Sequence, residues 1–255
     1  MQDMKLQRLA IAPAQLQNQQ ILLTSEQQHY LSRVLRLRQG DRFVAMDGRG
    51  QWWLAELSGT EAQILEPIQI QTELPVSITL LIALPKGNGF DEVVRSCAEL
   101  GVSCIVPIIS DHTLLNPSSQ KLERWRRIAI EAVEQSERQI VPIILDPVTF
   151  GNMSRVTSHL LSVENQKYIC VTRGEFPHLL GCLTNKGHTN DKEQMTITIA
   201  IGPEGGWTKS EVENAIALGF QPVSLGQRIL RAVTAPVVAL SLVAAIFECK
   251  LDSNK

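Results

Sequence analysis

The 255-residue sequence contains no long hydrophobic run. A membrane-spanning helix needs about 18 or more consecutive apolar residues, and the most apolar stretch, residues 232–247, is shorter and predicts a core helix. The first ten residues, MQDMKLQRLA, have no apolar segment typical of a signal peptide. The sequence therefore predicts a cytoplasmic protein without a membrane anchor.

Patterns for disulfides and metal ligands are also missing. No two of the five cysteines form a C-x-x-C pair, and the five histidines form no HExxH or similar cluster. We therefore expect buried, reduced thiols and no metal site. A net charge of −2 argues against a surface that coats nucleic acid broadly.

The chain has neither a GxGxxG dinucleotide fingerprint nor a GxxxxGK[ST] phosphate loop, which disfavours NAD chemistry and nucleotide hydrolysis. It has instead two other glycine turns. The first, residues 202–206 (GPEGG), follows an apolar strand predicted at 196–201. Thr208 and Glu211 then form a capping box, and Gly219 has the place of a C′ residue, so we predict a helix over 208–218. A strand, a glycine turn and a helix N-terminus together are typical of a ligand-binding loop, and the alternative for this turn alone is a tight strand-to-helix connection in an ordinary α/β domain.

The second turn, residues 225–231 (LGQRILR), follows a short strand near 222–224 and precedes a helix predicted at 233–249. Glycine turns after two neighbouring strands suggest one site lined by both loops. Arg228 and Arg231 suit an anionic partner or negative charge that develops during a reaction.

The pattern of apolar segments changes near residue 72. Before it, short alternating segments separated by Asp47-Gly48 and Ser58-Gly59 predict a small β-barrel, with one helical turn near 25–35. After it, strands at 77–83, 104–109, 143–145, 167–172 and 196–201 alternate with helices at 89–100 and 119–137, with a weak helix near 152–162 and a polar loop at 184–194. This alternation predicts an α/β domain with a mostly parallel sheet, giving domains 1–72 and 73–255.

Positive charge forms two local groups, one between residues 33 and 42 and one between residues 121 and 127. The candidates for contact with RNA phosphates are Arg33, Arg36, Arg38 and Arg42. A solvated surface is the alternative interpretation of such a short run. His29, just before this run, is by default a surface or core histidine.

The motifs GPEGGW, SLGQRILR and the following Thr-Ala resemble those of the RsmE family of 16S ribosomal RNA uridine N3-methyltransferases, in the SPOUT superfamily of knotted methyltransferases. Further matches are spread over nearly the whole chain, including Arg8, Val34-Leu35-Arg36, Lys86-Gly87 and Gln135-Ser136. The resemblance implies a PUA-like N-terminal β-barrel that binds RNA, and a C-terminal domain that ends in a trefoil knot. It also implies a homodimer, for which the helix at 233–249 is a candidate interface, although a core helix is nearly as plausible.

The resemblance further implies that S-adenosylmethionine binds among three loops, one after the strand near 167–172 and the two glycine turns. The residues it assigns to the cofactor are Thr172, Ile201, Gly202, Pro203, Glu204, Gly205, Gly206, Leu225, Gly226, Ile229 and Leu230. Glu204 is expected to tie loops together rather than to act as a base. No metal is implied.

The implied reaction is methylation of N3 of uridine 1498 in 16S rRNA of the small ribosomal subunit, on an unpaired or flipped base. Uridine N3 must lose a proton, and Arg231, with Arg8 as a second candidate, would stabilise the anion. Where the family has an acidic residue after this arginine, the present chain has Val233, so the sequence identifies no general base. The alternatives are a methyltransferase of tRNA or of another rRNA site, and a non-catalytic RNA-binding protein.

Overall fold

The computed structural model describes residues 6–113, 117–153, 165–185 and 195–253. The chain divides into two compact units. The first contains Met1–Glu73 together with Ile130–Val141, and the second contains Leu74–Ala129 and Pro142–Lys255. The sequence indicated one boundary, near residue 72, and gave no sign that Ile130–Val141 belongs with the first unit.

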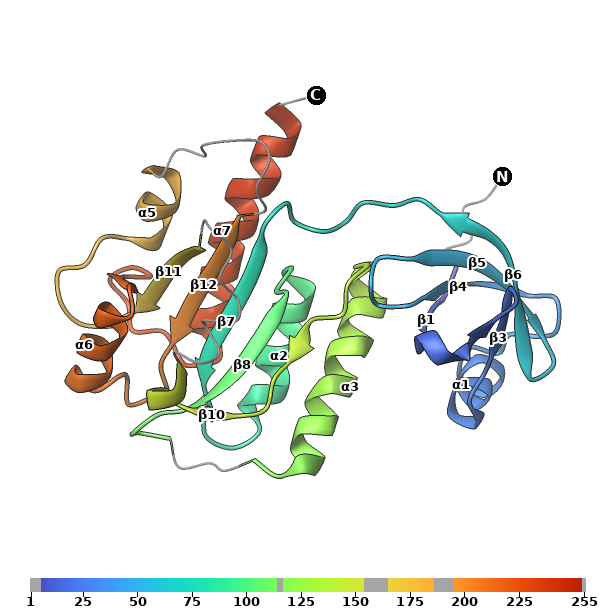
Figure 1. Ribbon diagram of the computed structural model, residues 1–255, viewed down its shortest axis with the longest axis horizontal. Helices are drawn as coiled ribbons and strands as arrows, with labels where there is room; N and C mark the ends of the chain where they lie inside the picture. Colours follow the sequence, from blue (N-terminus) through green and yellow to red (C-terminus); the bar gives the residue numbers. More distant parts are fainter. Residues whose placement is uncertain (1–5, 114–116, 154–164, 186–194, 254–255) are drawn as a thin grey trace. The chain divides into compact units, whose positions relative to one another are not determined.

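The first unit is built on a curled, six-stranded, half-barrel sheet (Figure 1). Its order is β1-β4-β5-β6-β3-β2, so β1 and β2 form the two edges. β1 pairs with β4 in parallel, and the other neighbours are antiparallel. The strands are β1 (Arg8–Ala10), β2 (Leu16–Gln17), β3 (Gln20–Leu22), β4 (Arg42–Met46), β5 (Trp52–Ser58) and β6 (Glu61–Ile68).

A helical segment packs on this sheet, as predicted near 25–35. α1 (Ser25–His29) begins after Thr24, whose hydroxyl accepts from the Gln27 N–H, and continues into a π-helical turn, η2 (Tyr30–Val34). Leu31 is fully buried with Ile21 in the core of this unit. A short 3₁₀ turn, η1 (Pro13–Gln15), precedes β2.

The last turns of α3 (Ser119–Ser136) also belong to the first unit. Glu134 Oε1 accepts from the Ala10 N–H at 2.6 Å. Burial raises the pKa of Glu134, and Glu131 nearby raises it too, whereas the bond from Ala10 lowers it. This carboxylate therefore connects the helix to β1.

The second unit contains a sheet in which every pair of neighbouring strands among the described residues is parallel. The order is β10-β8-β7-β12-β11-β13, and β9 pairs with β8. The strands are β7 (Ser77–Ala83), β8 (Cys104–Ile109), β9 (Ile143–Ile144), β10 (Val148–Thr149), β11 (Asn165–Cys170), β12 (Thr196–Ile201) and β13 (Gln221–Val223). This confirms the predicted mostly parallel sheet.

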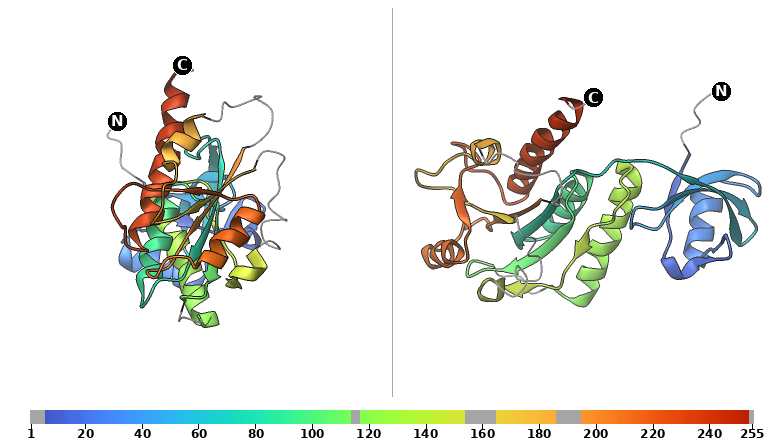
Figure 2. Two further views of the ribbon diagram at one scale, coloured as in Figure 1. Left: turned by 90° about the vertical axis from the view of Figure 1, so that its left-hand side faces the viewer. Right: turned by 45° about the horizontal axis from the view of Figure 1, so that its top comes forward.

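The central strands β7 and β12 are buried along nearly their whole length, because helices cover both faces of the sheet (Figure 2). On one face, Ala215 and Phe220 pack with Leu81, Ile169 and Ala200. On the other, α7 contacts β12, α2 and α5. The helices are α2 (Gly89–Glu99), α5 (Leu179–Asn185), α6 (Lys209–Ala217) and α7 (Thr234–Ser253), with a 3₁₀ turn η3 (Phe150–Asn152).

Most predicted elements are confirmed, some to the residue. The bounds of β7, β8 and β12 are those expected, whereas β11 begins and ends two residues earlier. The sequence did not indicate β2, β10 or α5. Most of the weak helix near 152–162 and most of the polar loop at 184–194 lie outside the described residues.

Two further expectations concern α7 and the knot. α7 buries Ala239, Leu240, Val243 and Phe247, and its contacts with α2, α5 and β12 make it a core helix. Its role in a dimer stays a prediction, as does the threading of the trefoil knot.

The predicted capping of α6 is confirmed. The Thr208 hydroxyl accepts from the Glu211 N–H at 3.2 Å, and the Glu211 carboxylate accepts from the Thr208 N–H at 2.8 Å. At the other end of the helix, Gly219 has φ = +85°, as a C′ residue requires.

Gly219 and Gly181 form a matched pair for testing backbone strain. A Cβ at either position would meet nothing within 4 Å, but only Gly219 has a positive φ. We expect Gly219→Ala to lower the free energy of unfolding by about 1 kcal/mol, because alanine is strained in the left-handed region. Gly181→Ala, within α5, should instead raise it by about 0.5–1 kcal/mol. Urea unfolding measures both changes, and equal effects of the two substitutions would contradict this explanation.

Candidate functional site

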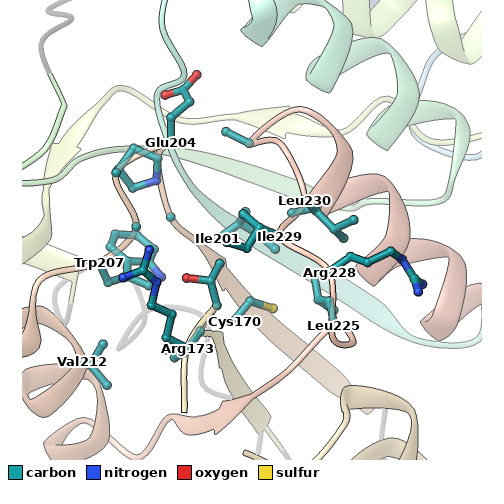
Figure 3. A pocket seen from close by; sticks show the side chains of 18 of the residues that line it. Cys170, Arg173, Ile201, Glu204, Trp207, Val212, Leu225, Arg228, Ile229 and Leu230 are labelled. Atoms are coloured by element: carbon teal, nitrogen blue, oxygen red, sulfur yellow. The ribbon is translucent and has the colours of Figure 1, made fainter.

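A cavity of about 540 Å³ lies at the carboxyl ends of β11, β12 and β13 (Figure 3). These three strands are neighbours and parallel, so the loops that follow them begin at the same edge of the sheet. The ends of these strands and the loops contribute residues 170–173, 201–207, 225–226, 228–230 and 232 to the lining. The lining includes all eleven residues that the sequence assigned to a cofactor: Thr172, Ile201, Gly202, Pro203, Glu204, Gly205, Gly206, Leu225, Gly226, Ile229 and Leu230.

The first glycine turn has little room for side chains. A Cβ on Gly202 would lie 3.3 Å from the Trp207 ring, and a Cβ on Gly205 would lie 3.1 Å from His112 Nδ1. Gly206 has φ = +70°, a left-handed backbone conformation that glycine adopts without steric strain. The turn is therefore fixed closely against its neighbours.

Residues of two other loops form hydrogen bonds with this turn. Glu204 Oε1 accepts from the Lys86 N–H at 3.1 Å, which is the connecting role expected for Glu204. His112 Nδ1 donates to the Gly206 carbonyl oxygen at 2.9 Å, since a carbonyl can only accept. The sequence gave no indication of His112, because its position depends on which strands are brought together.

The second glycine turn is shaped by its own backbone. Gly226 has φ = +116°, and its N–H donates to the Ser224 hydroxyl at 3.0 Å. The same hydroxyl lies 3.1 Å from the Gly226 carbonyl oxygen, to which it donates. These bonds turn the chain so that Leu225 and Ile229 both line the cavity.

Apolar side chains form a substantial part of the cavity walls. In Figure 3, Ile201, Leu225, Ile229 and Leu230 lie on one side of the opening, and Trp207 and Val212 lie on the other. Ile229 is 70% exposed, which is unusual for a large aliphatic side chain. The indole Nε1 of Trp207 is buried without a hydrogen-bond partner. Such walls suit a ligand with a flat apolar part and a few polar groups.

Charged groups are few in this cavity. Among the described residues, Arg173, Lys209 and Arg228 line it with the single carboxylate Glu204. Lys209 pairs with Glu213 at 3.8 Å. The Arg228 side chain points away from the cavity in Figure 3.

The two predicted catalytic arginines have different surroundings. Arg231 is exposed and lies between Leu230 and Ala232, which both line the cavity, although Arg231 itself does not. Arg8 is in β1 of the first unit, where its Nη2 lies 2.7 Å from Glu137 Oε1 and its guanidinium lies 5.7 Å from the centre of the Trp52 ring. Their catalytic roles stay predictions.

Val233 packs against the start of α2. A Cβ built on Gly89 would lie 2.8 Å from Val233 Cγ1, so the two residues are in close contact. An apolar packing role thus accounts for valine at this position.

The basic residues of the first unit lie on its surface. Arg33, Arg36, Arg38 and Arg42 are all exposed. Arg36 has φ = +59° and follows the π-helical turn η2. Arg42 lies 3.7 Å from Glu56, a distance that leaves most of its charge available to solvent.

The described residues contain no group of three or more metal-binding side chains, and no described helix is long and apolar enough to cross a membrane. None of the five cysteines, all of which lie in the described part of the chain, forms a disulfide; four are buried, but Cys249 is exposed, contrary to the expectation of buried thiols. Cys249 is near the end of α7, where the helix extends past the core. His29 is exposed, as assumed by default.

Comparison with known proteins places this geometry in a family. A model described as the RNA methyltransferase domain matches residues 72–244, and one described as the RNA methyltransferase PUA domain matches residues 23–65. A protein of Synechocystis, ribosomal RNA small subunit methyltransferase E, is 49% identical over 94% of this chain and 78% of its own length. The chain belongs to the ribosomal RNA small subunit methyltransferase E family.

Solved structures agree with this assignment. Ribosomal RNA small subunit methyltransferase E of Neisseria gonorrhoeae, bound to S-adenosylmethionine, superposes with a TM-score of 0.80 at 31% identity, covering 95% of this chain and 98% of that one. A Legionella pneumophila protein in complex with bound SAM has the same TM-score at 26% identity, with the same coverage. The half-barrel and the parallel sheet are therefore those of the PUA-like and SPOUT-type domains that the sequence led us to expect.

Cys170 lines the cavity, and its burial raises the pKa of its thiol to about 12. At about pH 8 only on the order of one thiol in ten thousand would be ionised, and the thiolate is the form that reacts. We expect iodoacetamide to modify the exposed Cys249 well before Cys170 in the native protein. Peptide mass spectrometry measures both rates, with the unfolded protein as the control in which they converge. Equal rates in the native protein would show that Cys170 is accessible.

Proposed function

We propose that this protein transfers a methyl group from S-adenosylmethionine to N3 of one uridine, uridine 1498, in 16S rRNA of the small ribosomal subunit. The observation that carries the proposal is that one cavity collects all eleven predicted cofactor residues, in a fold shared with a relative bound to S-adenosylmethionine. We further propose that the protein acts as a homodimer in the cytoplasm.

The residues present fit this cofactor. A cavity of about 540 Å³ is within the range usual for small-molecule ligands. Leu225, Ile229 and Leu230 provide an apolar wall for the adenine, and Gly202, Gly205 and Gly206 allow the backbone to approach the ligand closely. S-adenosylmethionine would supply an activated methyl group on its sulfonium, so the protein has mainly to position donor and acceptor.

The nucleophile presents the harder problem, because N3 of uridine carries a proton. Loss of that proton spreads negative charge over the two neighbouring carbonyl oxygens, and a fixed guanidinium stabilises this charge. We assign this role to Arg231, which is exposed beside the lining residues Leu230 and Ala232. Arg8, the second candidate, is already paired with Glu137.

The target base must be unpaired or flipped out, because N3 lies on its Watson–Crick edge. We propose that the exposed basic cluster Arg33, Arg36, Arg38 and Arg42 holds the RNA through its phosphates. Such contacts position the RNA without reading its sequence, which suits a protein of low net charge that acts on one folded site.

The direct test is methyl transfer from labelled S-adenosylmethionine to small ribosomal subunits from cells that lack this protein. We expect label at one uridine, mapped as a reverse-transcription stop, because an N3-methyl group blocks base pairing. Subunits from wild-type cells, already methylated, are the control that should accept no label.

The other outcomes are distinct. Label at a different nucleotide would keep the methyltransferase and exclude the proposed target. Label only in tRNA would identify another substrate class. Cofactor binding without transfer to any RNA, or no cofactor binding, would exclude the proposed enzyme.

Arg231→Ala tests the proposed charge stabilisation. We expect kcat to fall about 100- to 1,000-fold, as when one stabilising donor is removed from a catalytic site, while the Kd for S-adenosylmethionine stays unchanged. Gln227→Ala is the matched control, because Gln227 belongs to the same loop, is exposed and does not line the cavity. If Arg231→Ala kept full turnover, or if both variants lost it equally, the role of Arg231 would be wrong.

A further inference from the structure

The loop after β8 makes several contacts with the loop after β12, although the two are about a hundred residues apart in sequence. Asp111 N–H donates to Glu211 Oε1 at 3.0 Å, and the Thr208 hydroxyl donates to Asp111 Oδ2 at 3.3 Å. Glu211 is only 3% exposed, so the bond that it accepts from Asp111 is partly sheltered from water, whereas the bond from Thr208 to Asp111 is exposed. They attach the β8 loop to the N-terminus of α6.

His112, the next residue, reaches the glycine turn itself. Its Nδ1 donates to the Gly206 carbonyl oxygen at 2.9 Å. Its ring also covers Gly205 so closely that an added Cβ would lie 3.1–3.3 Å from three ring and side-chain atoms. A single side chain thus holds one residue of the turn by a hydrogen bond and its neighbour by van der Waals contact.

We propose that His112 is a positioning residue for the cofactor, acting through the turn Gly202–Gly206. The inference rests on the proposed function, because it takes this turn as part of the S-adenosylmethionine site. A turn rich in glycine has many accessible conformations when it is unconstrained. Only the fraction in the binding conformation takes up the ligand, so loosening the turn weakens the apparent affinity in proportion to that fraction.

Other hydrogen bonds between these loops do not depend on His112, so the loss of its side chain should affect cofactor binding more than the stability of the fold. The bonds between Asp111, Thr208 and Glu211 do not involve the His112 side chain, and neither does the bond from Lys86 N–H to Glu204. α6 therefore keeps its attachment to the β8 loop when His112 is replaced. The substitution should affect mainly the Gly205-Gly206 part of the turn.

Isothermal titration with S-adenosylmethionine tests the proposal on the full-length protein. We expect His112→Ala to weaken the Kd about five- to tenfold, the usual effect of one lost hydrogen bond with its packing. His112→Asn should restore much of the affinity, because the asparagine amide can donate from nearly the same position as Nδ1. Small-subunit rRNA affinity, measured separately, should stay at the wild-type value in both variants.

A double-mutant cycle with Gly205 tests the contact directly. Gly205→Ala alone should weaken the Kd, because its methyl group meets the His112 ring, whereas its φ is not in the left-handed region. The same substitution in the His112→Ala background should cost less, since the ring is gone. Gly181→Ala, in open space within α5, is the control that should leave the Kd unchanged.

The outcomes distinguish this inference from the proposed function. If the wild-type protein bound no S-adenosylmethionine, the proposed function would fail first. If the wild type bound it and His112→Ala bound it equally well, the positioning role alone would be excluded. Additive effects of Gly205→Ala and His112→Ala would exclude the packing contact, and a failure of His112→Asn to restore affinity would exclude the hydrogen bond.

Discussion

The site depends on the parallel pairing of β11 with both β12 and β13. In this arrangement Ile169 lies opposite Ala200, and Cys170 lies opposite Val223. The three strands therefore end at nearly the same level, and the three loops that follow them start side by side. A one-residue shift in either pairing would exchange the side chains that pack on the two covered faces of the sheet, so close packing on both faces fixes the register and with it the positions of the loops.

Within this frame the loops are shaped by two different local causes. Gly202 and Gly205 are in tight contact with Trp207 and His112, so the limited space favours glycine there. Gly206 and Gly226 have positive φ angles, so glycine is favoured there by the backbone. Since the glycines have no side chains, the rigidity of the turns must come from neighbouring residues, and this is why contacts from distant loops matter for the site.

Elements with strong local signals could be predicted from the sequence. Local sequence alone predicts the strands β7, β8 and β12 from their apolar runs, and the start of α6 from its capping box. β2 and β10 have only two residues each and exist because a partner strand pairs with them. The eleven cofactor candidates came from a resemblance to a family, and their convergence in one cavity follows from strand order. His112 could not be found in this way, because nothing near Asp111 in the sequence indicates that β8 and the β12 loop meet.

The environment of the carboxylates bears on the proposed methylation of uridine, in which N3 must lose its proton. Glu204 accepts a hydrogen bond from Lys86, and Glu211 accepts from Thr208 and Asp111 as part of a helix cap. Both carboxylates thus have structural partners, and Val233 is packed against Gly89. The mechanism that we propose does not need a carboxylate base: the cationic Arg231 would lower the free energy of the uridine anion, and water would accept the proton. In such a mechanism the rate depends on how well the methyl donor is positioned relative to the rare anion, which makes the rigidity of the glycine turns part of the catalysis.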